Sequence, residues 1–280
     1  MSIDQAKKYI RRLRAEVPLR RQFELVWQGK RRDPDKIYRT SGKPVVPHVL
    51  AASIPDSKTD PEGYRRWWAL QRAQQDMHDL LFSKGEGRDH AQRYVDDLMV
   101  TGERITEVMN EPEMEASLDL LARIANATTD ASIDLDDMKA AWHGFVRWVF
   151  HTTEYSARND EVRRLRDAAA KDPALRDRVN GPVASSGMSA GAAIAIQNYL
   201  ETGFAAEDAY EKLDSHKAWM EEVAAAAREA GYDFSVLDYV RDCISKQRED
   251  DPGPDLDDRY WPEDDPNKWN YEPPPVFFTF

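Results

Sequence analysis

The 280-residue sequence has a single cysteine, Cys243, and no long hydrophobic run. One cysteine excludes an intrachain disulfide, a CxxC redox pair and a zinc site built from several thiolates. No apolar stretch approaches the roughly 18 residues that a membrane-spanning helix needs, and the first residues contain no signal-peptide core. We therefore expect a cytoplasmic protein that does not associate with a membrane.

Strand patterns and nucleotide-binding motifs are also missing. No segment alternates apolar and polar residues between turn signals, and the chain has no Walker loop, dinucleotide fingerprint or EF-hand loop. Apolar residues instead recur at helical spacing, which predicts an all-α fold, an irregular multi-helix bundle. We expect two short helices within 3–28 and further helices near 62–82, 89–109, 112–126, 134–155, 158–180, 190–201, 205–213, 215–231 and 234–248.

Proline and charge are unevenly distributed along the chain. Residues 1–48 carry 13 basic and 5 acidic residues, whereas residues 249–280 carry 2 basic and 10 acidic ones, so the two ends should attract each other, within a chain or between subunits. The predicted parts are basic N-terminal helices (1–29), a proline-rich irregular linker (30–61), a helical bundle (62–180), a second helical region (181–248) and an acidic aromatic tail (249–280).

The tail combines acidic residues with an unusual number of aromatic ones. Its prolines exclude a helix, and its charge is typical of a disordered solubilising tail. Exposed rings would promote association, however, which favours docking on the body of the protein or on a partner. Presentation of the tail as a substrate is a further alternative. The predicted docking residues are Trp261, Trp269, Tyr271, Phe277, Phe278 and Phe280.

Several segments resemble the halves of Nif11-like modules, the helical domains that serve as leader peptides of some modified peptides. Residues 215–245, with the core AREAGYDFSVLDYV, resemble the second half, and residues 120–142 echo it more faintly. MSIDQAKKYIRRLRAEVPLRRQFE and RRLRDAAAKDPALRDRV resemble the first half. The resemblance implies a helical recognition module that presents a segment to a peptide-modifying enzyme.

The sequence GMSAG (187–191) fits the Gly-x-Ser-x-Gly pattern of serine hydrolases, and the residues after it resemble the helix that follows the nucleophile in patatin-like lipases. Such a nucleophile needs a feeding strand and an oxyanion loop. The preceding PVASS is too short and polar for a buried strand, and no glycine-rich loop precedes it. We expect Ser189 to cap a helix, with a degenerate hydrolase as the alternative.

His143, His151 and Glu154 share one predicted helix face, which could line a groove of the bundle. Helical di-metal sites use Glu-x-x-His pairs, and none of the six histidines has a glutamate three residues before it. We expect His143 and His151 to be half-buried packing residues and predict no metal or cofactor. A metal-dependent oxidase built on these three residues is the alternative.

The segment Tyr64-Arg65-Arg66-Trp67-Trp68 interleaves basic and aromatic residues, a combination that can bind nucleic acid. The net charge of −12 opposes such binding, so no nucleic-acid partner is expected. By elimination, the sequence predicts a non-catalytic interaction or scaffold protein that docks or presents its tail to a protein partner or to another copy. The alternatives are an enzyme and a subunit of a larger assembly such as a phage particle.

Overall fold

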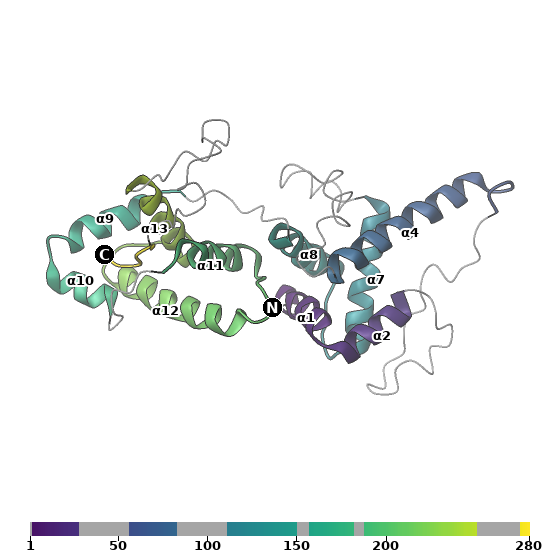
Figure 1. Ribbon diagram of the computed structural model, residues 1–280, viewed down its shortest axis with the longest axis horizontal. Coiled ribbons are helices and arrows are strands. Elements are labelled where there is room, and N and C mark those ends of the chain that lie inside the picture. The colour runs from purple at the N-terminus through teal and green to yellow at the C-terminus, as the bar shows by residue number, and fades with distance from the viewer. Residues whose placement is uncertain (1, 28–55, 83–110, 150–156, 182–187, 251–274) are drawn as a thin grey trace, which may run out of the picture. The chain divides into compact units, whose positions relative to one another are not determined.

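The computed structural model describes residues 2–27, 56–82, 111–149, 157–181, 188–250 and 275–280 (Figure 1). Within these ranges the chain is helical apart from turns, short extended segments and one isolated antiparallel β-bridge, so the predicted all-α class is confirmed. The helices are α1 (Ser2–Ala15), α2 (Val17–Trp27), α4 (Pro61–Phe82), α7 (Pro112–Thr128), α8 (Leu135–Val149), α9 (Asp160–Ala169), α10 (Pro173–Asn180), α11 (Ala190–Thr202), α12 (Tyr210–Glu229) and α13 (Val236–Asp250). None of these described helices is both long and apolar enough to cross a membrane.

The chain forms two compact units. Unit 1 comprises Met1–Thr152 and Thr202–Glu207, and unit 2 comprises Thr153–Glu201 and Asp208–Phe280. The range 62–180, expected to form one bundle, therefore contributes to both units. The expected helix 89–109 and nearly all of the expected linker 30–61 lie outside the described residues.

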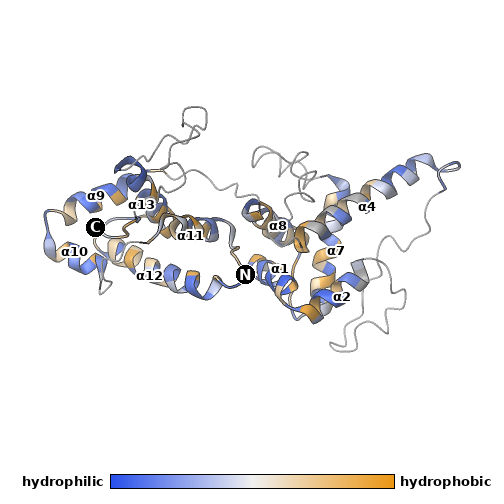
Figure 2. Cartoon of the chain, viewed as in Figure 1, coloured by the Kyte–Doolittle hydropathy of each residue, from blue (hydrophilic) through white to orange (hydrophobic). Residues whose placement is uncertain are grey.

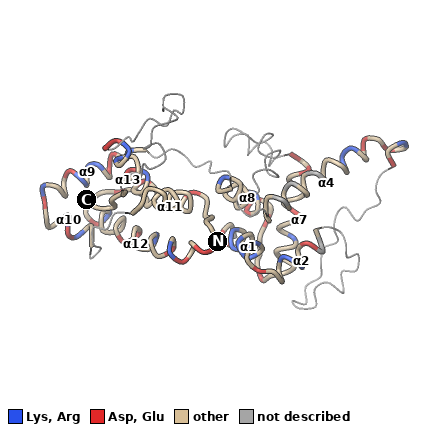
Figure 3. The backbone as a smooth tube through the Cα atoms, viewed as in Figure 1, with Lys and Arg blue, Asp and Glu red and all other residues tan. Residues whose placement is uncertain are grey.

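Unit 1 packs two pairs of helices against each other, with α4 alongside. The first pair, α1 and α2, contacts the second pair, α7 and α8: α1 packs on α8 and α2 on α7. Apolar residues at helical spacing supply the contact faces, which are orange in Figure 2. The polar face of α1 carries a cluster of basic residues, visible in blue in Figure 3. Its core includes Ile10, Leu13, Phe23, Leu118, Leu121, Trp142 and Phe145, joined by Phe204 from the segment 202–207.

The helix pairs of unit 2 pack against each other in the same way as those of unit 1. Its first pair, α9 and α10, contacts its second pair, α12 and α13: α9 packs on α13 and α10 on α12. The sequence RRLR occurs in both first pairs, at 11–14 in α1 and 163–166 in α9, and a proline lies in the first turn of the second helix of each first pair, Pro18 in α2 and Pro173 in α10. The two units therefore share one arrangement, in line with the sequence similarity between their helix pairs.

Two predicted helix boundaries are wrong. The range 158–180 was expected to be one helix, but it contains α9 and α10, separated where Asp172 caps α10 and Pro173 opens it. Proline lacks the N–H that would continue α9, and the Asp172 carboxylate accepts from the N–H groups of Ala174 and Leu175 instead. Conversely, 205–213 and 215–231 were expected to be two helices. They contain the single helix α12, because no glycine or proline interrupts it before Gly231, whose φ is 91°.

Candidate functional site

Residues 275–280, the docked segment, lie extended on unit 2. The N–H of Val276 donates to the carbonyl of Met188 at 2.7 Å, and the N–H of Met188 donates back to Val276 at 2.8 Å. Side chains alternate between the two faces of the segment: Val276 and Phe278 are 0% and 4% exposed, whereas Phe277 is 53% exposed. This period of two is the pattern of a strand with one buried face.

Asn180 holds the far end of the docked segment. Its side-chain oxygen accepts from the N–H of Phe280 at 2.9 Å, and its amide nitrogen donates to the carbonyl of Phe280 at 3.4 Å. Asn180 is the last residue of α10, which ends because Gly181 follows with a φ of 62°. One side-chain amide thus pairs with both backbone groups of Phe280, as a neighbouring strand would.

Aromatic side chains from three places in unit 2 receive the buried face of the docked segment. The Phe280 ring stacks on Tyr239 of α13, with 5.1 Å between ring centres and 15° between ring planes, and lies 6.3 Å from Phe234 in the preceding turn. Phe278 lies with its edge toward Tyr239 at 5.9 Å and toward Trp219 of α12 at 6.4 Å. Contacts of this kind contribute beyond the apolar area that they bury.

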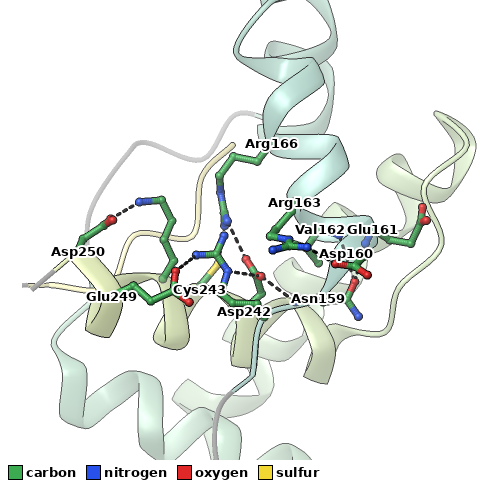
Figure 4. A network of polar contacts seen from close by, with 12 residues as sticks. Asn159, Asp160, Glu161, Val162, Arg163, Arg166, Asp242, Cys243, Glu249 and Asp250 are labelled. Atoms are coloured by element: carbon green, nitrogen blue, oxygen red, sulfur yellow. Dashed lines mark hydrogen bonds and ion pairs between the residues drawn. The ribbon is translucent and has the colours of Figure 1, made fainter. Parts of the chain in front are cut away.

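A buried ionic cluster adjoins this aromatic site (Figure 4). The Asp242 side chain is fully buried, and it accepts from Arg158 Nε at 2.9 Å, from Arg166 Nη1 at 2.7 Å and from the N–H of Asn159 at 2.9 Å. Arg158 also donates to Glu249 at 2.7 Å. A buried carboxylate is tolerated only when it is paired in this way, so the cluster fixes α13 to the residues that begin and line α9.

Arg166 belongs to both the ionic cluster and the aromatic site. Besides its bond to Asp242, its guanidinium carbon lies 5.9 Å from the centre of the Phe280 ring, within the range of a cation–π contact. Its Nη2 donates to the sulfur of Cys243 at 3.6 Å. The residue that neutralises Asp242 therefore also contacts the docked segment.

Burial suppresses the ionisation of the two titratable neighbours of Asp242 on α13. It raises the pKa of the Cys243 thiol from 9.0 to about 12, although the charge of Arg166 acts in the opposite direction. It also raises the pKa of Tyr239 well above its ordinary value, and the Tyr239 hydroxyl has no hydrogen-bond partner in the part of the chain that the structure describes. A neutral, buried thiol is a poor nucleophile, so the geometry is suited to binding and not to covalent chemistry at Cys243.

Comparisons with known proteins do not identify this chain. No protein-family model matches the chain, and no curated protein and no solved structure does. Its role has to be inferred from the geometry of its own residues.

The predicted docking residues fall in three different environments. Phe278 is buried on unit 2, Phe280 is half-buried against Tyr239, and Phe277 points to solvent. The other predicted residues, Trp261, Trp269 and Tyr271, lie outside the described residues.

The sequence interpretation missed Val276 of the docked segment and the residues that receive this segment. Val276 was overlooked because only aromatic residues were considered, although the alternation of Val276, Phe278 and Phe280 was a readable signal. Asn180, at the end of α10 before Gly181, lies in no motif that would mark it as a binding residue. Asp242 gave no signal at all, because an aspartate in a polar helix is ordinarily exposed and its burial depends on arginines about 80 residues away in the sequence.

Ser189 lies at the start of α11 and is exposed. Its hydroxyl accepts from the N–H of Ala192 at 3.3 Å, which is the helix-capping contact expected from the sequence. Residues 182–187, where a feeding strand would lie, are outside the described residues.

His143 lies on α8 in unit 1, where burial, aided by the charge of Arg147, lowers its pKa. His151 and Glu154 lie outside the described residues, so the expected constellation of the three cannot be assembled. Among the residues that the structure describes, no group of three or more His, Cys, Asp or Glu side chains could hold a metal ion.

Proposed function

We propose that this protein is a non-catalytic helical interaction protein whose second unit is a docking module for an extended aromatic segment. One observation carries the proposal: unit 2 binds the docked segment through its backbone at Val276 and Phe280 and through Phe278 between them. Backbone bonds give affinity for any extended peptide, and the inward side chains give specificity.

The energetic terms support docking that can be reversed. Burying Val276 and Phe278 contributes about 3 to 6 kcal/mol. The four hydrogen bonds at Val276 and Phe280 add about 2 to 6 kcal/mol. Ordering six residues costs about 6 to 12 kcal/mol, which nearly balances these gains. A segment held by so small a difference can be released, as a docking function requires.

The contacts between helices support a modular origin for this function. The two segments that resemble Nif11-like halves in unit 2 form the pairs α9–α10 and α12–α13, which pack on each other although α11 separates them in the sequence. We therefore include a leader-like role in the proposal, in which unit 2 recognises a segment that is presented to a peptide-modifying enzyme.

Neighbouring phenylalanines on opposite faces of the docked segment provide the test. Phe278→Ala removes a ring that is 4% exposed, and Phe277→Ala removes one that is 53% exposed. Replacing a buried phenylalanine by alanine costs about 3 to 5 kcal/mol. This cost exceeds the small net free energy that keeps the segment docked, so Phe278→Ala should release it. The exposed site should tolerate alanine within about 0.5 kcal/mol.

Alkylation of Cys243 reports on release, because the chain has no other thiol. Tyr239 precedes Cys243 by one helical turn, and Arg166 contacts both Cys243 and Phe280, so loss of the segment opens this side of α13. We expect Phe278→Ala to raise the alkylation rate and lower the melting temperature, with Phe277→Ala resembling the unmodified chain. Equal rates and melting temperatures for the two variants would refute docking.

A further inference from the structure

The site on unit 2 and the segment that it binds belong to the same chain, but none of their contacts depends on that connection. In the described part of the chain, the docked segment is bound through the hydrogen bonds at Val276 and Phe280 and through its side chains, the Phe280 ring included. The same segment on a second copy of the chain would make the same contacts. Exchange of an identical element between two copies needs no new complementary surface, which makes it a low-cost route to a dimer.

The sequence allows such an exchange. Twenty-four residues, 251–274, connect α13 to the docked segment, and a chain of that length can span at most about 80 Å.

Resting on the proposed docking function, we propose that unit 2 is also a self-association site, which binds residues 275–280 of a second copy when its own segment is released. Alternation of Val276, Phe278 and Phe280 is the recognition pattern, and Asn180 and Met188 bind the incoming backbone. The partner is thus another copy of this chain, which carries that pattern and the connection needed to deliver it.

Mass action determines when the exchange occurs. A linker of this kind gives the chain's own segment an effective concentration on the order of 1 mM at its site. At micromolar protein concentration the closed form therefore dominates. Exchange prevails where copies are crowded to a similar concentration, or where a chain's own segment no longer binds.

Two full-length variants test the proposal by complementation. The acceptor carries Phe278→Ala and Phe280→Ala, so its site is intact but its own segment is defective. The donor carries Tyr239→Ala and Cys243→Ala, so its segment is intact, its site is defective and it has no thiol. A control donor carries Phe278→Ala and Phe280→Ala in addition to the donor's own substitutions, so both its site and its segment are defective. Alkylation of Cys243 in a mixture then reports on the acceptor alone.

We expect the donor to slow alkylation of the acceptor in a saturable way, by about tenfold when its concentration is ten times the dissociation constant. Sedimentation velocity should show a complex of acceptor and donor. The control donor should neither slow the alkylation of Cys243 nor form this complex. A synthetic peptide of residues 275–280 should also protect Cys243 and should dissociate the complex.

Three results would overturn the exchange. The first is no protection by the donor at concentrations up to about 1 mM, which is the effective concentration of the chain's own segment. The second is protection by the peptide but not by the donor, and the third is equal complex formation with donor and control donor. Failure of the docking function itself looks different, because the acceptor alone would then be alkylated no faster than the unmodified chain.

Discussion

Arg166 donates to Asp242 at 2.7 Å, and the carboxylate that it neutralises is completely buried. Arg158 makes the second ion pair with the same carboxylate, at 2.9 Å. Removing the charge of Asp242 leaves Arg166 without this ion pair and Arg158 with the more exposed Glu249, which costs more than the ion pairs themselves contribute. Unit 2 should therefore be sensitive to loss of the Asp242 charge.

Asp242→Asn should destabilise unit 2 strongly. We expect a loss of about 3 to 5 kcal/mol, because Arg158 and Arg166 lose their shared counter-ion. Asp250→Asn is a matched control on the same helix: Asp250 pairs with Lys246, but its side chain is 62% exposed. That change should cost less than about 0.5 kcal/mol. Urea unfolding, followed by pulsed alkylation of Cys243, measures both values, and similar midpoints for the two variants would contradict the prediction.

The raised pKa of Cys243 makes the stability of unit 2 fall in alkaline solution. The unfolded thiol loses its proton near pH 9, whereas the folded thiol keeps it until the pKa of about 12. Between these values the unfolded state binds fewer protons, so stability decreases as pH rises, by roughly 1 kcal/mol per pH unit from this group. Tyr239, whose pKa is also raised, acts in the same direction.

Cys243→Ala isolates the contribution of the thiol. The variant should lose stability less steeply above pH 9 than the unmodified chain, and the two should have parallel pH dependences below it. Urea midpoints from circular dichroism between pH 7 and pH 10.5 provide the measurement. Identical slopes above pH 9 would show that the thiol does not titrate as described.

Substitution by alanine should change stability in opposite directions at two glycines. A Cβ on Gly144 of α8 would lie 2.6 Å from the carbonyl oxygen of Thr202, a backbone atom, so Gly144→Ala should destabilise unit 1 by about 1 to 3 kcal/mol. A Cβ on Gly191 of α11 would meet nothing within 4 Å, so Gly191→Ala should stabilise its helix by up to about 1 kcal/mol. Thermal unfolding distinguishes the two, and a shift of the same sign in both would refute this account.

Much of the helical architecture was predictable because it depends on local signals. α4 and α7 begin at Pro61 and Pro112, and their apolar spacing gave their extents within about two residues. The break at Pro173 was missed, although the proline marks it, because the apolar spacing on either side suggested one helix. The RRLR sequence shared by 11–14 and 163–166 also had structural meaning, since both stretches lie in the first pair of helices of a unit.

The site was less predictable because it is assembled from distant parts of the sequence. The aromatic residues of the tail drew attention to Phe278 and Phe280, but their partners lie on α10, α12 and α13 and carry no motif. The burial of Asp242 cannot be predicted from the sequence of α13, because most of its residues are polar and an aspartate in such a helix is ordinarily exposed. Only the packing of α9 on α13 brings Arg158 and Arg166 to it.

The two like units create a problem of pairing during folding, which the Asp242 cluster reduces. When the RRLR segments and the α8 and α13 sequences are aligned, Ala141 of unit 1 stands where unit 2 has Asp242, and Ala6 stands where it has Arg158. If α1 packed by mistake on α13, Asp242 would be buried against Arg14 without the second arginine. Such a pair would lack the hydrogen bonds that Arg158 and the N–H of Asn159 give the buried carboxylate, so the cluster distinguishes the correct helix partner from a close copy.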